Sequence, residues 1–187
     1  MTNYKNSSKN RPKLLLHVCC AVCALYPTSL LSKDFEITLF FYNPNIHPRE
    51  EYNKRLEGVK IISKKYSIPL IIDRYELKKW FRLTENYKFE PEGGGRCSIC
   101  FDMRLKRTAA AAKKLKFDLF GTTLTVSPHK NKDIINSIGK DAADNKNIKF
   151  YSADFKKKNG FKKTMDTAKK INIYRQNYCG CIYSLHN

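Results

Sequence analysis

The sequence has no apolar run long enough to cross a membrane. It begins with the polar segment MTNYKNSSKNRPK, and the apolar run that follows, LLLHV, is five residues long. A membrane span needs about 20 apolar residues, and a secretory signal needs a longer apolar stretch after its charged start. We therefore expect a protein of the cytoplasm, where cysteines stay reduced and serve metals or catalysis.

The sequence also lacks the glycine-rich loops that bind phosphates. The first predicted strand is followed by HVCCAVC, and neither G-x-G-x-x-G nor G-x-x-x-x-G-K-[ST] occurs. Such loops bring backbone N–H groups to a phosphate at the start of a helix. Their absence leaves nucleotide-dependent activation, and nicotinamide or flavin bound in the Rossmann manner, without support from the sequence.

Acidic residues are scarce. The 187 residues include 36 Lys and Arg but only 17 Asp and Glu, which gives a formal net charge of +19. A surplus of this size attracts a polyanion, so nucleic acid is the predicted partner. A lysine-rich surface without a partner would give the same total, and the charge does not distinguish RNA from DNA.

Apolar runs typical of buried strands alternate with segments of helical spacing. The predicted strands cover 14–18, 36–42, 69–73, 117–124 and 148–154. The predicted helices cover 24–31, 49–66, the stretch around Trp80, 97–116, 133–143 and the second half of 155–176. This alternation predicts an α/β fold with a mostly parallel sheet and helices on both faces. We expect residues 1–12 to form a disordered polar tail and 13–187 a single catalytic domain.

The seven cysteines fall into three tight clusters. The clusters are Cys19, Cys20 and Cys23, then Cys97 and Cys100, then Cys179 and Cys181. Thiols used as small core residues would be scattered instead. The first cluster directly follows a predicted strand, and the ligands of parallel sheets bind beyond the carboxyl ends of the strands. The clustering indicates that thiolate ligands, or a dithiol pair, converge on one site.

Two of the clusters together offer four thiolates. Cys19 and Cys20 with Cys97 and Cys100 could bind a tetrahedral zinc ion or a [4Fe–4S] cluster. Adjacent cysteines are awkward ligands for a single zinc ion, because neighbouring side chains diverge in extended backbone. Zinc fingers also usually show two C-x-x-C knuckles, and among these four cysteines only Cys97 and Cys100 form one. The spacing therefore favours the iron–sulfur cluster.

The remaining cysteines allow alternatives. Cys179 and Cys181 could close a small strained disulfide, because Gly180 permits unusual backbone, or they could be two more metal ligands. Cys23 could ligate a metal, attack as a nucleophile or pack in the first helix. His17 ends the first strand in an apolar run and is predicted to be a core histidine. Asp102 and Asp154 are expected to be solvated surface carboxylates.

Lysines and aromatic residues alternate ahead of the last cysteine pair. The lysines lie at 156–158, 162–163 and 169–170, and the aromatic residues among them include Phe155, Phe161 and Tyr174. Lysines contact phosphates, and aromatic rings stack on unpaired bases. A solvated helix face explains the lysines alone, but it explains their position beside the cysteines less well.

The sequence resembles the cobalamin-independent epoxyqueuosine reductases of the QueH type. The matching segments are LLLHVCCAVC (14–23), FFYNPNIHPREEYNKR (40–55), EGGGRCSICFDMRL (92–105), TTLTVSPHKN (122–131), DFKKKNGFKKT (154–164) and IYRQNYCGCIYS (173–184). They span nearly the whole chain after the amino-terminal tail, in the family's order. One departure is Val22, where the family pattern has Pro.

The resemblance implies reduction of epoxyqueuosine to queuosine at the wobble position of tRNA. It also implies a [4Fe–4S] cluster on Cys19, Cys20, Cys97 and Cys100, a redox-active disulfide between Cys179 and Cys181, and a nucleotide-hydrolase-like α/β sandwich. An external electron donor is then required, and an additional mononuclear metal beside the cluster stays open. Two alternatives are an iron–sulfur enzyme that transfers sulfur to tRNA and a zinc-stabilised RNA-binding module without catalysis.

Overall fold

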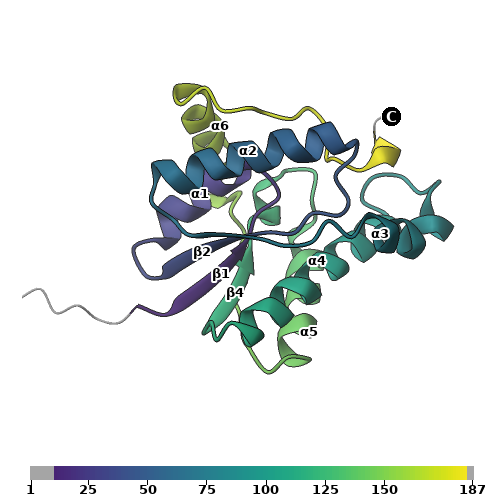
Figure 1. Ribbon diagram of the computed structural model, residues 1–187, viewed down its shortest axis with the longest axis horizontal. Helices are drawn as coiled ribbons and strands as arrows, with labels where there is room; N and C mark the ends of the chain where they lie inside the picture. The colour runs from purple at the N-terminus through teal and green to yellow at the C-terminus, as the bar shows by residue number, and fades with distance from the viewer. Residues whose placement is uncertain (1–10, 185–187) are drawn as a thin grey trace, which may run out of the picture.

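The computed structural model describes residues 11–184, which fold around one sheet (Figure 1). All strand pairs in the sheet are parallel, and the strand order is β3-β2-β1-β4-β5. The strands are β1 (Lys13–His17), β2 (Glu36–Phe41), β3 (Leu70–Ile72), β4 (Leu119–Thr122) and β5 (Lys149–Phe150).

Helices cover both faces of the sheet. In Figure 1, α1, α2 and α6 lie over one face, and α3, α4 and α5 lie over the other. The helices are α1 (Ala21–Leu31), α2 (Arg49–Lys65), α3 (Leu77–Thr84), α4 (Gly95–Lys114), α5 (Lys132–Asp144) and α6 (Gly160–Lys170). Short 3₁₀ turns cover Glu85–Tyr87, Leu124–Val126, Lys157–Asn159 and Ile182–Ser184. Within residues 11–184, every helix is too short or too polar to span a bilayer.

The middle strand, β1, is buried on both faces. Leu14, Leu15 and Leu16 are each 0% exposed, because β2 and β4 flank the strand and helices cover it. A strand covered on both faces is apolar at consecutive positions, which is the pattern of LLLHV. The chain places β2 on one side of β1 and β4 on the other, so the order of strands reverses here. The carboxyl end of β1 is therefore where ligands bind in such sheets.

The predicted α/β architecture is confirmed, but some strands are shorter than expected: of the predicted run 117–124, only Leu119–Thr122 form β4. The run 148–154 was predicted to be a strand, but β5 contains only Lys149 and Phe150. Beyond it, the Asn136 side chain of α5 takes the place of the strand ladder. Its Nδ2 donates to the Ala153 carbonyl at 3.2 Å, and its Oδ1 accepts from the Ala153 N–H at 3.4 Å. Residues 1–10 of the predicted tail lie outside the described residues.

His17 joins the carboxyl ends of three strands. It is fully buried, with Nδ1 3.0 Å from the Thr122 hydroxyl at the end of β4 and Nε2 3.2 Å from the Tyr42 carbonyl after β2. A neutral ring meets both partners, with Nε2–H donating to the carbonyl and Nδ1 accepting from the hydroxyl. Burial lowers the pKa of His17 to about 4, with a contribution from the nearby Arg104 guanidinium. His17 is thus the core histidine that the sequence predicted.

Acid should destabilise the fold through His17. Its pKa is about 4 in the folded chain and about 6.5 when unfolded, so between these values the unfolded state binds the extra proton. Lowering the pH from 7 to 5 should remove about 2 kcal/mol of unfolding free energy through this residue. Urea unfolding of metal-free protein at both pH values measures the change. His17→Gln should shrink the loss by that amount and the exposed His129→Gln should not; an unchanged loss in His17→Gln would contradict the assignment.

Candidate active site

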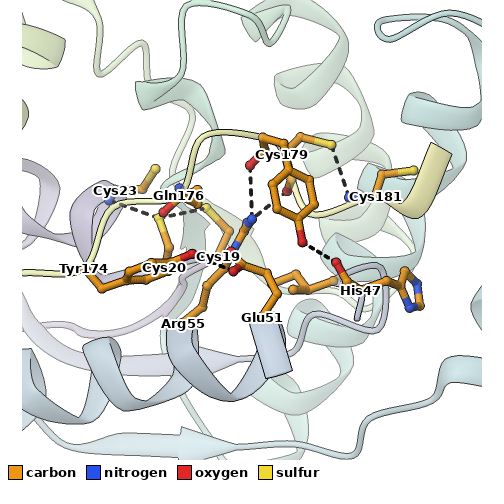
Figure 2. Close-up of polar contacts among 12 residues, drawn as sticks. Cys19, Cys20, Cys23, His47, Glu51, Arg55, Tyr174, Gln176, Cys179 and Cys181 are labelled. Atoms are coloured by element: carbon orange, nitrogen blue, oxygen red, sulfur yellow. Dashed lines mark hydrogen bonds and ion pairs between the residues drawn. The ribbon is translucent and has the colours of Figure 1, made fainter. Parts of the chain in front are cut away.

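The first cysteine cluster gathers at the start of α1. Cys20 caps the helix, and its Sγ accepts from the Cys23 N–H at 3.4 Å. The Sγ atoms of Cys19, Cys20 and Cys23 all lie within 4.8 Å of one another, close enough to share a metal ion. Gln176, from the segment after α6, donates from Nε2 to the Cys20 Sγ at 3.0 Å (Figure 2).

The other two cysteine clusters meet in one cavity. Cys97 and Cys100, on the first turns of α4, line it together with Cys179 and Cys181 from the carboxyl-terminal segment. The Gly93 N–H donates to the Cys97 Sγ at 3.2 Å. The cavity therefore joins two segments that are about 80 residues apart in the sequence. The other residues of its wall are Asn45, Trp80, Glu92, Gly93, Arg96, Phe101, Arg104, His129, Lys130, Asn131 and Ile134.

The first cysteine cluster lies near two cations, Lys130 and Arg104. Hydrogen bonds from Cys20 and Cys23 hold the pKa of Cys19 well below its ordinary value, and the nearby Lys130 and Arg104 lower it further. Hydrogen bonding to the Cys19 thiolate raises the pKa of Cys20 to about 12 and also raises that of Cys23. The first cluster is thus one thiolate supported by two thiols, the state in which a metal ligand is ready to bind.

Cys179 and Cys181 form a similarly unequal pair. The hydrogen bond from Cys181 lowers the pKa of Cys179 to about 5, and that bond raises the pKa of Cys181. The Cys181 N–H also donates to the Cys179 Sγ at 3.4 Å (Figure 2). Gly180 between them has φ +103°, and a Cβ there would lie 3.0 Å from the Arg55 Nη1. Both cysteines are free thiols in this structure, so the predicted disulfide is not formed.

Arg55 holds the carboxyl-terminal cysteine segment against α2. Its guanidinium is buried and donates to the carbonyls of Tyr178 and Cys179, both at 3.0 Å (Figure 2). Its Nε pairs with Glu51 one helical turn earlier at 2.6 Å. The second carboxylate oxygen of Glu51 accepts from the Tyr174 hydroxyl at 2.6 Å. Every charge in this network is therefore paired, as burial demands.

Comparison with known proteins assigns the family. Residues 14–187 match the family model described as "Epoxyqueuosine reductase QueH". The chain belongs to this family. Relatives of the same name include one from Streptococcus pyogenes, 39% identical over 180 residues with 93% of this chain and 71% of the relative covered. One from Thermotoga maritima is 40% identical over 175 residues, covering 92% of this chain and 90% of the relative. As a QueH family member, the protein is an oxidoreductase.

A solved structure shares the fold. The U34-tRNA thiolase NcsA from Methanococcus maripaludis, solved with its [4Fe-4S] cluster, matches with a TM-score of 0.61 and 14% identity. The match covers 94% of this chain and 62% of the thiolase chain. Identity this low shows similarity of fold and nothing further. It agrees with the α/β architecture that the sequence predicted for the QueH chain.

Each pair of the predicted four-ligand set lies beside further cysteines. Cys19 and Cys20 lie with Cys23, whose role the sequence left open, while Cys97 and Cys100 lie with the Cys179–Cys181 pair. Phe155, named among aromatic residues that could stack on bases, is a core side chain 3% exposed and is not available for stacking. Asp102 is a surface carboxylate, paired with Lys106 at 2.9 Å as a solvated group would be.

Sequence reasoning missed three buried arginines, Arg55, Arg96 and Arg104. Arg104 lies four residues after Cys100 and donates from Nε to its carbonyl at 3.0 Å, so helical spacing puts both on one face of α4. Arg55 lies between Tyr52 and Val59, which are both buried on the core side of α2. A cation at a core-facing position of an amphipathic helix was a signal that could have identified it.

Removing the Arg55 guanidinium should destabilise the QueH chain strongly. Arg55→Met leaves Glu51 buried without its cation and two carbonyls without donors, which should cost about 3–5 kcal/mol of unfolding free energy. Urea denaturation monitored by circular dichroism measures the loss. Lys60→Met on the same helix, where Lys60 pairs with Glu57 in solvent, is the matched control and should change stability by less than about 0.5 kcal/mol. Equal effects of both substitutions would contradict the network.

Cys179 should react as a thiolate at neutral pH. Because its pKa is about 5, its rate of alkylation by iodoacetamide should stay nearly constant between pH 6.5 and 8. An ordinary thiol with a pKa near 8.5 should react about tenfold faster per pH unit over that range. Mass spectrometry of metal-free protein after short exposures gives the rate at this cysteine, with N-acetylcysteine as the reference. A tenfold rise per pH unit at Cys179 would show that the thiol is not activated.

Proposed function

We propose that this protein reduces epoxyqueuosine to queuosine at the wobble position of tRNA, in a net two-electron reaction. The observation that carries the proposal is the meeting of Cys97, Cys100, Cys179 and Cys181 in one cavity at the carboxyl edge of the sheet, in a chain of the QueH family. A cavity lined by four thiols offers metal ligands and a two-electron reductant to the same substrate.

The thiols and a buried cation support the presence of an iron–sulfur cluster. We propose Cys19, Cys20, Cys97 and Cys100 as the ligands, with Cys23 left for a further mononuclear metal. Arg104 is 3% exposed and lines the cavity, and within residues 11–184 no carboxylate forms an ion pair with it. A buried guanidinium requires a negative partner, and four cysteine thiolates around a [4Fe–4S] core carry net negative charge.

The Trp80 side chain supports the same proposal. It lines the cavity, and its buried Nε1 makes no hydrogen bond of ordinary geometry with the described residues, although it lies close enough to Cys100 to favour the thiolate there. Such a donor suits a sulfur acceptor. When bound, the cluster supplies single-electron transfer from an external donor. The Trp80 N–H donor and the Arg104 positive charge both lie on the wall of the cavity in which we propose that the cluster binds.

The Cys179–Cys181 pair can supply the two electrons that reduction of the epoxide needs. Loss of the epoxide oxygen as water, with formation of the carbon–carbon double bond, takes up two electrons and two protons. Oxidation of the pair to a disulfide releases two electrons and the proton held on the Cys181 Sγ, and the second proton comes from solvent. Gly180 at φ +103° permits the backbone of so small a ring. The external donor then reduces the disulfide for the next turnover.

The charge of the chain supports tRNA as the partner, and the reaction would then take place in the cytoplasm. Six lysines at 157–158, 162–163 and 169–170 are exposed along α6 and the turn before it. Exposed lysines supply the phosphate contacts that RNA binding requires. The wobble nucleotide belongs to a single-stranded loop, so it can enter a pocket without melting a duplex.

A second candidate is sulfur transfer to tRNA, the kind of activity named for the U34-tRNA thiolase that shares the fold. Strand β1 is followed by Cys19 and Cys20 and not by a glycine-rich phosphate loop. An enzyme that activates its substrate with a nucleotide needs such a loop. Turnover that requires ATP would favour the thiolase alternative, while about one zinc per chain without iron or sulfide would favour the RNA-binding module.

A single-turnover assay tests the reductase. Cluster-reconstituted protein, a strong reductant and tRNA carrying epoxyqueuosine are mixed without oxygen, cobalamin or ATP, and the released nucleosides are weighed. The expected result is loss of one oxygen from the modified nucleoside. Cys97→Ala should lose both iron and turnover, whereas Cys181→Ala should keep its iron and lose more than about a hundredfold in rate. Full activity of a colourless Cys97→Ala protein would refute the cluster assignment.

A further inference from the structure

Phe89 is the most exposed large apolar side chain in the described part of the protein. It is 92% exposed, while the next, Ile61, is 54% exposed. The Lys88 ammonium lies 5.0 Å from the centre of the ring. Exposing a phenyl ring to water costs free energy relative to burying it, so a ring this exposed marks a contact surface when it also lies close to a site.

The Phe89 ring lies on a loop that hydrogen bonds from Arg96 fix in place. The Arg96 guanidinium is buried, and its Nη1 donates to the carbonyls of Tyr87, Lys88 and Glu90 at 2.9, 3.0 and 2.5 Å. These carbonyls lie on both sides of Phe89. The Arg96 backbone N–H also donates to the Glu90 carboxylate at 3.1 Å. Four hydrogen bonds anchor this glycine-rich loop, so the ring loses little freedom when it binds a partner.

The loop that Arg96 anchors, residues 87–93, borders the cysteine cavity. Glu92 and Gly93 line the cavity, and so does Arg96, the residue that anchors the loop. The Gly93 N–H contacts the Cys97 Sγ directly. Phe89 is therefore three residues in sequence from the cavity wall, and its ring is exposed to solvent. Lys130 lies in the same wall, as does the Glu92 carboxylate, so Lys88 and Lys130 place two ammonium groups at this border.

We propose that Phe89 stacks on the nucleobase next to the modified nucleotide while that nucleotide occupies the cavity. This inference rests on the proposed function. Extruding one nucleotide from an anticodon loop exposes the face of its neighbour, and an aromatic ring covers such a face whatever the base is. The adjacent ammonium of Lys88 suits the phosphate that joins the two nucleotides. A ring and a cation close in sequence to a thiol-lined cavity fit an RNA loop better than an apolar protein surface.

Binding and turnover of an epoxyqueuosine anticodon stem-loop test the stacking. Phe89→Ala should raise KM about 5- to 150-fold, since stacking on one base contributes about 1–3 kcal/mol. The kcat and the iron content should stay unchanged, because Phe89 touches neither the cavity thiols nor the core. Phe89→Tyr should restore KM and Phe89→Leu should not. Tyr66→Ala removes another exposed aromatic ring, 44% exposed at the end of α2, and should leave KM unchanged.

A spectroscopic variant reports the contact without turnover. Phe89→Trp should bind as the wild type does, and its added indole fluorescence should be quenched by the stem-loop, whereas the fluorescence added by Tyr66→Trp should not. A wild-type KM for Phe89→Ala or Phe89→Leu would overturn the stacking, as would unquenched fluorescence in Phe89→Trp with bound RNA. Failure of the wild-type protein to reduce the substrate would instead overturn the proposed function, because stem-loop quenching is measured without any reaction.

Discussion

The buried guanidinium of Arg55 is the interaction on which the thiol site depends. The Arg55 side chain projects from α2 and donates to two successive carbonyls, those of Tyr178 and Cys179. These residues lie more than 120 positions later in the sequence. The segment between α6 and Ser184 has no strand and one short 3₁₀ turn, so it has no sheet to hold it. Charge-assisted hydrogen bonds supply the order that a ladder would otherwise give.

Hydrogen bonds from neighbouring groups also stabilise negative charge among the thiols. In each group one cysteine is stabilised as the thiolate by its neighbours, Cys19 by Cys20 and Cys23, and Cys179 by Cys181. Arg104 and Lys130 add positive charge where these thiolates lie. Thiolate is the form that binds metal and attacks a disulfide or an electrophile. The site is therefore built for ligand or redox chemistry before any cofactor enters, which agrees with membership of the QueH family.

Local sequence patterns predicted the elements well because their causes are local. The consecutive leucines of β1 indicated a buried strand, and helical spacing over 49–66 indicated α2. Strand lengths were predicted less well, above all at β5, where Asn136 of α5 replaces the ladder after two residues. A strand at the edge of a sheet depends on its neighbours for its length, and periodicity within the strand carries no information about them.

Residue types and their spacing were enough to predict the parallel α/β class, the three cysteine clusters, the core position of His17 and the family. Each of these depends on patterns over a few turns or strands. The folded chain was needed to learn that Cys23 joins Cys19 and Cys20, that Phe155 is core, and that Arg96 anchors the loop of Phe89. Those outcomes depend on which distant segments the packed sheet and helices bring together. Packing at that range is a property of the whole fold, since burial and hydrogen bonding are shared among segments far apart in the chain.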